Sequence, residues 1–249
     1  MLADVTTQTD NGLALYMRDE GWIEPLSAAQ FPDFPADLMF EDVGPLVQLT
    51  VPVIGYNTDL LGDFAPASWK DLLDPRLEGE IMIADPRTAA TWGQIWYAVL
   101  NTPELGASYV EELGATGFEP VASSLVGAEQ LTAGQGAVLV ASTPSVFDAQ
   151  IAKGAPIEYF SPTDPAPVSY TSVSLIAQAD HPNAAHLFAL WLTGEEGSRV
   201  MNGAERTASP LGIEGDGVFP LPPGTNTTPP APESVQEAGE EAAGLLGFN

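Results

Sequence analysis

The chain has 249 residues, 45% of them hydrophobic, so it can bury a substantial core as one large domain or two smaller ones. Its 34 acidic residues against 7 basic ones give a formal net charge of -27, and a field of this sign repels nucleic acid and anionic membranes. The absence of cysteine excludes disulfides and cysteine-based zinc sites, and no apolar run reaches the roughly 20 residues that a membrane span needs.

The acidity has two interpretations. A surplus of carboxylates keeps a surface soluble, and this is the simpler explanation. Lys70 and Lys153 are the only lysines, which also fits adaptation to a salty or acidic exterior. Unfolding measured at low and at molar salt separates the two, because only adaptation predicts a salt dependence.

The first 57 residues predict a few short elements, an irregular connector and then a strand that crosses from one part of the fold to another. Residues 3–26 indicate a strand end, a helix around 13–20 and a turn. Residues 27–47 are rich in proline and aspartate, which is typical of a connector. Residues 48–57 are β-branched, and Pro52 favours an edge or crossover strand.

The middle of the chain alternates predicted strands and helices. Ser68 is placed to cap a short helix, and residues 80–84 form an apolar strand. Further strands are predicted at 117–124 and 136–142, the second apolar enough for a sheet covered on both faces. Helices are predicted after residue 91, over 103–114, over 127–133 and after Thr143.

The last third predicts a return crossover and then helices. Residues 168–178 alternate as a strand does, and residues 180–183 cap a helix over 183–193. A further helix begins at Gly194. Residues 220–232 are rich in proline and threonine and should be extended, and residues 233–246 predict a final helix.

The polar turn after the strand 80–84 is the first candidate binding site. A strand that leads through a polar turn into a helix start points free N–H groups and the positive end of the helix dipole at one spot. Arg87 adds a guanidinium that can bind a carboxylate or phosphate, and Thr88 and Thr91 add hydroxyls. The simpler alternatives are that Arg87 pairs with Asp85 to hold the turn and that the threonines cap the helix.

Two further hydroxyl pairs stand where a strand is followed by a helix. Ser123 and Ser124 are one pair, and Ser142 and Thr143 the other. Ligands of open α/β sheets lie beyond the carboxyl ends of the strands, so all three turns are expected on one rim. N-capping alone explains Ser and Thr at these positions, so we expect one of the two pairs to contact ligand.

The sequence carries no recognisable catalytic or metal motif. His181 and His186 are five residues apart rather than four, and no HExxH, G-x-S-x-G or P-loop pattern occurs. We therefore expect no catalytic residue, no resident metal and no cofactor.

The order of elements resembles the extracellular solute-binding proteins of ABC importers, in the branch that holds ferric-iron, phosphonate, thiamine and polyamine binders. The resemblance rests on Ala3-Asp4-Val5, on the turn at 21–26 (GWIEPL) and above all on residues 181–202 (HPNAAHLFALWLTGEEGSRVMN). In that family, two βα units and a ligand loop come before the first of these motifs. This chain therefore resembles the family without its N-terminal portion, through truncation, a misplaced start or natural reduction.

The resemblance implies an α/β fold of the type 2 periplasmic-binding-protein kind, with two lobes, a cleft and two crossover strands. Lobe one, which is incomplete, would comprise residues 1–50 and 178–249. The hinge strands would comprise residues 51–57 and 168–177, and lobe two would comprise residues 58–167. It also places Tyr170 in the return crossover, facing the cleft, where family tyrosines can contact ligand. The iron binders hold their metal with an adjacent Tyr-Tyr pair, which this sequence lacks.

The function implied is capture of a small anion-bearing solute in the periplasm or outside the cell, at the membrane, and its delivery to the permease subunits of an ABC transporter. Closure of the lobes would let both contact one ligand. Ferric iron and polyamines are alternative ligands of the same fold. An enzyme on this fold, or a remnant that no longer binds, remains a different class of explanation.

Overall fold

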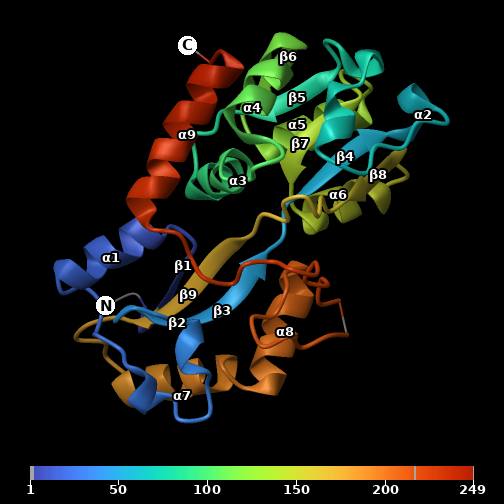
Figure 1. Cartoon of the computed structure of the whole chain (residues 1–249). Helices are drawn as coiled ribbons and strands as arrows, with labels where there is room; N and C mark the ends of the chain where they lie inside the picture. The colour runs from blue at the N-terminus through green and yellow to red at the C-terminus, as the bar shows by residue number, and fades with distance from the viewer. Residues whose placement is uncertain (1–2, 216, 249) are drawn as a thin grey trace. The chain divides into compact units, whose positions relative to one another are not determined.

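The structure, a computed structural model, describes residues 3–215 and 217–248 and divides into two compact units. The first unit comprises the described residues up to Thr50 together with Val168–Leu221 and Asn226–Glu233. The second comprises Val51–Pro167, Pro222–Thr225 and the described residues from Ser234 onward. The fold is α/β, as predicted, with one sheet in each unit (Figure 1).

The sheet of the first unit has four strands in the order β1-β9-β3-β2, and each neighbouring pair is antiparallel. Helix α7 packs on it through Ala185, Ala189 and Leu192, which share a core with Val173 and Leu175 of β9. Proline at the first position of α7 supplies a preset φ where no N–H is needed. The strands and helices of this unit are β1 (Val5–Gln8), α1 (Asn11–Asp19), β2 (Met39–Phe40), β3 (Gly44–Thr50), β9 (Ser169–Leu175), α7 (Pro182–Leu192) and α8 (Glu195–Glu205), with short 3-10 helices at Ala28–Gln30 and Ala36–Leu38.

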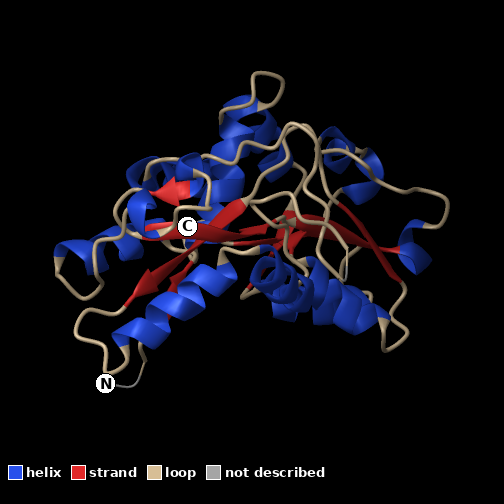
Figure 2. Cartoon of the chain, turned by 90° about the horizontal axis from the view of Figure 1, so that it is seen from below, coloured by secondary structure: helices blue, strands red, loops and turns tan. Residues whose placement is uncertain are grey.

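The sheet of the second unit has five strands in the order β6-β5-β7-β4-β8. Strands β5, β6 and β7 are parallel, whereas β4 is antiparallel to both of its neighbours. In Figure 2 the strands of the units are drawn red and the helices that cover them blue. The elements are β4 (Val53–Asn57), α2 (Thr58–Leu61), β5 (Ile81–Ala84), α3 (Ala90–Leu100), α4 (Gly106–Ala115), β6 (Phe118–Val121), α5 (Ser124–Thr132), β7 (Val138–Ser142), α6 (Pro144–Ile151), β8 (Ile157–Phe160) and α9 (Pro232–Leu246), with 3-10 helices at Lys70–Leu73 and Pro75–Leu77.

In the first part of β7, Leu139 faces the opposite side of this sheet from its two valine neighbours. Val138 and Val140 belong to the core that includes Trp96 of α3. Leu139 faces the other way, because a Cβ added to Gly127 of α5 would lie 2.6 Å from its side chain. Both faces are therefore covered, which explains why the strand is a continuous apolar run.

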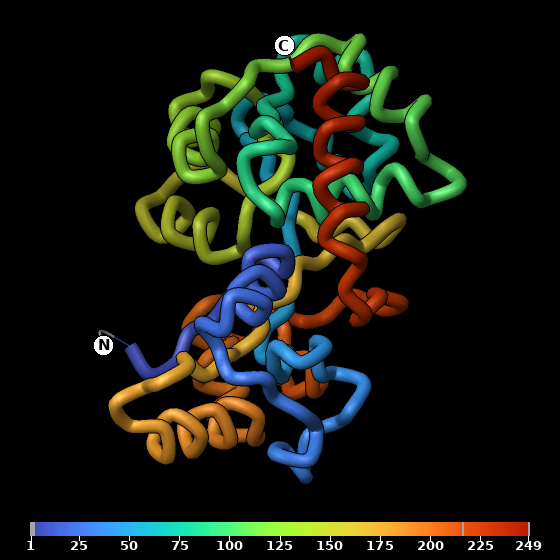
Figure 3. The backbone as a smooth tube through the Cα atoms, turned by 90° about the vertical axis from the view of Figure 1, so that its left-hand side faces the viewer, coloured from blue at the N-terminus to red at the C-terminus, as the bar shows by residue number. Residues whose placement is uncertain are grey.

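The C-terminal helix α9 packs within the second unit, which corrects the assignment of the whole segment 178–249 to lobe one. Its residues Ala242 and Leu246 are buried in the core that holds α3 and α4. Figures 1 and 3 show the helix, in red, running beside these green helices. The apolar pattern of residues 233–246 was enough to predict the helix. Its position could not be predicted in the same way, because it depends on Gly93 of α3 and Gly114 of α4, which let α9 approach these two helices closely.

We expect Gly93→Ala to destabilise the second unit. A Cβ at Gly93 would lie 2.8 Å from the carbonyl oxygen of Val235, so α9 would have to shift. The expected loss is about 1 to 2 kcal/mol of unfolding free energy, measured by urea unfolding. Gly244→Ala is the matched control, because a Cβ added there would meet no described atom within 4 Å outside its own stretch of α9. Helix propensity should stabilise this variant by up to about 1 kcal/mol. Equal stability of the two variants would contradict this packing.

Tyr56 of β4 predicts a pH dependence of stability at high pH. Burial and a 2.6 Å hydrogen bond from its hydroxyl to Glu158 Oε2 raise the pKa of Tyr56 to about 12. An unfolded tyrosine has a pKa of about 10, so the folded chain holds this proton more tightly. The associated stabilisation is complete below pH 10 and is lost as the pH rises through 12.

Tyr56→Phe should lower the free energy of unfolding by about 1 kcal/mol at pH 7 and flatten its decline between about pH 10 and 12. Urea unfolding at several pH values measures both effects. Tyr16→Phe is the control, because Tyr16 is an exposed residue of α1. If the unfolding free energy of Tyr56→Phe fell with pH in parallel to that of the unchanged protein, the bond to Glu158 would not form.

Candidate functional site

Three parallel strands of the second unit end at one edge of its sheet. In the register, Ala84 of β5 is opposite Val121 of β6, and Ile83 is opposite Val140 of β7. A short turn follows each strand and leads into α3, α5 or α6. We call this region the carboxyl edge and define it as residues 85–92, 122–126 and 142–146. It contains seven of the eight predicted site residues: Arg87, Thr88, Thr91, Ser123, Ser124, Ser142 and Thr143.

Arg87 is held in place by Asp85. Its backbone N–H and its Nε both donate to Asp85 Oδ1 at 2.9 Å, and its Nη2 donates to Oδ2 at 2.7 Å. The guanidinium beside Asp85 lowers the pKa of that carboxyl below its usual value. The pairing alternative weighed from the sequence is therefore present. Nη1 takes no part in these bonds, and about a third of the Arg87 side chain is exposed (34%).

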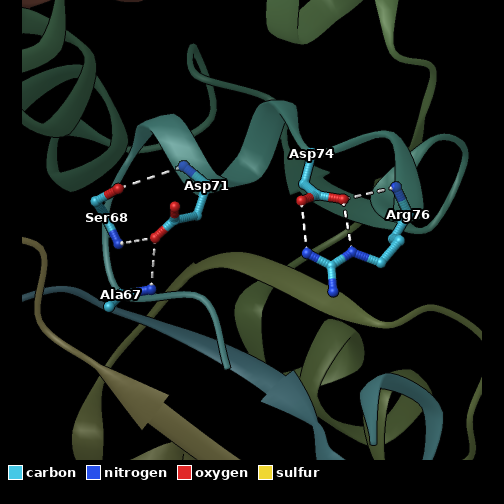
Figure 4. Close-up of polar contacts among 5 residues, drawn as sticks. All are labelled: Ala67, Ser68, Asp71, Asp74 and Arg76. Atoms are coloured by element: carbon cyan, nitrogen blue, oxygen red, sulfur yellow. Dashed lines mark hydrogen bonds and ion pairs between the residues drawn. The ribbon is translucent and has the colours of Figure 1, made fainter. Parts of the chain in front are cut away.

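The same arrangement occurs a second time, away from the carboxyl edge. Arg76 donates to Asp74 through its backbone N–H, its Nε and its Nη2, at 3.0, 2.8 and 2.7 Å (Figure 4). Its guanidinium also lies 3.7 Å from the centre of the Phe64 ring. The Asp-Pro-Arg sequence thus forms a turn clamp by itself, and Arg76 provides a matched comparison for Arg87.

The threonines near Arg87 have different surroundings. Thr88 is exposed, and its Oγ1 donates to the carbonyl oxygen of Asp85 at 2.8 Å, which closes the turn. Thr91 lies in the first turn of α3, whose N-cap residue is Ala89. Alanine has no side-chain acceptor, so the first N–H groups of α3 receive no side-chain cap.

Ser123 is the N-cap of α5 and accepts a hydrogen bond from the N–H of Val126 at 3.3 Å. This cap starts the helix at Ser124, three residues before the predicted start at Gly127. Ser123 therefore has the structural role that capping predicts, while Ser124 is the first residue of the helix.

Ser142 and Thr143 lie between β7 and α6. Ser142 is almost fully buried, 1% exposed, and its Oγ has no hydrogen-bond partner among the described residues. Thr143 is the N-cap of α6 but makes no side-chain cap bond, and its Oγ1 lies 3.1 Å from Ser145 Oγ.

The carboxyl edge has no net charge within a chain of net charge -27. By sequence, its only charged residues are Asp85 and Arg87, which form an ion pair. The first turns of α3, α5 and α6 contain no acidic residue. The positive ends of three helix dipoles are thus left without an acidic side chain, which suits an anion.

Tyr170 is not part of this edge. It lies in β9 of the first unit, is 4% exposed, and its hydroxyl donates to the carbonyl oxygen of Asn226 at 2.8 Å. The partner is 56 residues further along the chain, so sequence reasoning could not identify this contact.

Sequence reasoning missed a polar group in the first unit. Asn11, the first residue of α1, is 3% exposed, and neither its Oδ1 nor its Nδ2 has a hydrogen-bond partner within the described chain. Nearby in sequence, Thr9 Oγ1 lies 3.0 Å from Thr171 Oγ1. The signal that could have identified it is the Thr-Asp-Asn sequence between a strand and a helix, the pattern that was used at Ser123 and Ser142.

The described residues contain no group of three or more histidine, aspartate or glutamate side chains that could hold a metal ion. In the same residues, no helix is both long enough and apolar enough to cross a membrane.

Comparison with known proteins identifies the family. The sequence profile of the family described as "Bacterial extracellular solute-binding protein" matches residues 1–229. A protein of Haemophilus influenzae is 27% identical over 157 residues, which cover 59% of this chain and 44% of that protein, less than half of its length.

Solved structures share the fold. Iron-bound HitA from Pseudomonas aeruginosa has a TM-score of 0.68 at 17% identity, over 99% of this chain and 82% of that chain. AfuA from Actinobacillus pleuropneumoniae, with fructose-6-phosphate bound, has a TM-score of 0.63 at 19% identity, over 98% and 80%. A substrate-binding protein of an ABC transporter from Agrobacterium tumefaciens has a TM-score of 0.73 at 16% identity, over 98% and 78%. The profile match covers most of the chain, and the protein therefore belongs to the family of bacterial extracellular solute-binding proteins.

Proposed function

We propose that the carboxyl edge of the second unit binds the anionic group of a small solute, which this protein delivers to the permease of an ABC transporter. The observation that carries the proposal is the convergence of three helix starts, none with an acidic first turn, on an edge without net charge. In a chain this acidic, an edge whose own residues carry no net charge suits a negative group, and Arg87 also interacts electrostatically with Glu240 of α9.

The buried hydroxyl of Ser142 supports the same proposal. A buried polar group without a partner costs about 1 to 3 kcal/mol, and a ligand that supplied the missing bond would recover this cost. The open acceptor sites of an anion would take this bond and those of the uncapped N–H groups at the start of α3. Arg87 adds its Nη1, which takes no part in the bonds to Asp85, with Asp85 fixing the direction of the guanidinium.

Delivery to a transporter is supported by family membership and by the resemblance to the Agrobacterium protein, whose description names an ABC transporter. A family of solute-binding proteins also supports capture rather than catalysis. That the solute is enclosed by two lobes stays a prediction from the sequence.

Ferric iron is the main alternative, because HitA is described as iron-bound, whereas AfuA is described with a sugar phosphate. The described residues hold no metal-binding group of acidic or histidine side chains, and the chain has no Tyr-Tyr pair. Both observations favour the anion.

A thermal-shift screen in 150 mM salt tests the proposal, because a bound solute stabilises the native state by mass action. The panel should contain inorganic phosphate, methylphosphonate, a sugar phosphate, acetate, spermidine and ferric citrate. We expect at least one oxyanion to raise the melting temperature. A shift with spermidine or ferric citrate alone would contradict the proposal.

A further inference from the structure

Two large apolar side chains are exposed at the carboxyl edge. Leu125 and Val126, in the first turn of α5, are 54% and 39% exposed. The remaining apolar residues of this helix, Ala128 and Leu131, are fully buried. Leu125 and Val126 directly follow Ser123 and Ser124, so the apolar surface is continuous with one of the three helix starts.

A separate observation shows that polar groups at this edge lack hydrogen-bond partners. Ser142 Oγ is buried without a hydrogen bond among the described atoms, and the first N–H groups of α3 receive no side-chain cap. The edge therefore offers polar groups on its α3 side and an apolar surface on its α5 side. A solute that matched both would itself carry a polar end and an apolar end.

We propose that the solute is an amphipathic oxyanion, whose anionic group binds at the helix starts and whose hydrocarbon group of a few carbons lies on Leu125 and Val126. This inference rests on the proposed function and narrows its solute class. Hydrocarbon covered in this way gains affinity in proportion to the apolar area removed from water. A fully hydroxylated sugar phosphate would leave that surface unused.

Isothermal titration with methyl-, butyl- and hexylphosphonate tests the inference, with inorganic phosphate as the reference. For the unchanged protein we expect affinity to rise about threefold for each added methylene. The double variant Leu125→Ser with Val126→Thr should lose most of this rise and keep its affinity for methylphosphonate. Ile151→Ser, which replaces an exposed apolar residue at the other end of α6, is the matched control and should behave as the unchanged protein.

The possible results distinguish a failure of the apolar contact from a failure of the proposed anion site. Equal affinity for methyl- and hexylphosphonate, or an equal rise in the double variant, would overturn the apolar contact while leaving the anion site intact. Absence of binding for every phosphonate and for phosphate would overturn both. A loss of methylphosphonate affinity in the double variant, with a normal melting temperature, would show that α5 contacts the anion itself and would overturn the division of roles.

Discussion

Ser142→Ala is expected to make the protein more stable and its solute binding weaker. Removing a buried hydroxyl without a partner removes its desolvation cost, which should raise the unfolding free energy by about 1 kcal/mol. If that hydroxyl donates to the anionic group, its loss should cost about 1.5 to 3 kcal/mol of binding, roughly a 10- to 150-fold weaker affinity. Urea unfolding without ligand and titration calorimetry with the oxyanion found in the screen measure the two effects.

Ser174→Ala supplies the control for this experiment. Ser174 of β9 is also fully buried and its Oγ is likewise without a partner among the described residues, but it lies in the first unit. We expect the same gain in stability with no change in binding. If both variants bind the solute as the unchanged protein does, Ser142 is a buried hydroxyl that lowers stability and does not contact the ligand.

Arg87→Ala is expected to weaken oxyanion binding by about 1.5 to 3 kcal/mol, the range for hydrogen bonds to charged groups. The guanidinium is aligned by Asp85, so little side-chain entropy is lost when Nη1 donates to an anion. Stability should change little, because a partly exposed ion pair contributes little to it. Calorimetric titration and urea unfolding again report binding and stability separately.

Arg76→Ala tests whether the turn clamp alone explains any effect at Arg87. It removes the same two side-chain bonds to an aspartate from a turn outside the carboxyl edge, together with the contact between the guanidinium and the Phe64 ring. We expect unchanged affinity for the solute and a similar small change in stability. Were Arg87→Ala to bind as well as Arg76→Ala, Arg87 would be a clamp of its own turn and nothing more.

The sequence predicted the local elements well where one signal dominated. The strand β7 was recognisable because Val138, Leu139 and Val140 form an uninterrupted apolar run, and both faces of it are covered. The turn after β5 was recognisable because Asp85-Pro86-Arg87 stops the strand. The start of α5 was placed too late, at Gly127, because the preceding strand was extended to residue 124, whereas β6 ends at Val121 and Ser123 caps the helix.

The parts that could not be predicted depend on contacts between distant residues. The partner of Tyr170 is a backbone carbonyl at Asn226, and no sequence pattern encodes that pairing. The position of α9 depends on Gly93 facing Val235, a close approach that becomes visible only in three dimensions.

The candidate site shows the same division. Six of its residues were predicted because hydroxyls follow strands, and Arg87 was predicted because a cation stands in the same kind of turn; both are local patterns. Whether a hydroxyl is used up by capping or left free is decided by its surroundings in the fold. Ser123 caps α5, whereas Ser142 stays unpartnered among the described residues, although the two look alike in sequence.

An amide chemical-shift titration of the 15N-labelled protein with methylphosphonate tests the central claim most directly. Backbone N–H groups that meet an anion at a helix start shift strongly when it binds. The largest changes are expected at Thr91, Ser124 and Ser145, one in the first turn of each of the three helices at the carboxyl edge. Saturable binding with these three amides unmoved would place the solute elsewhere and contradict the account.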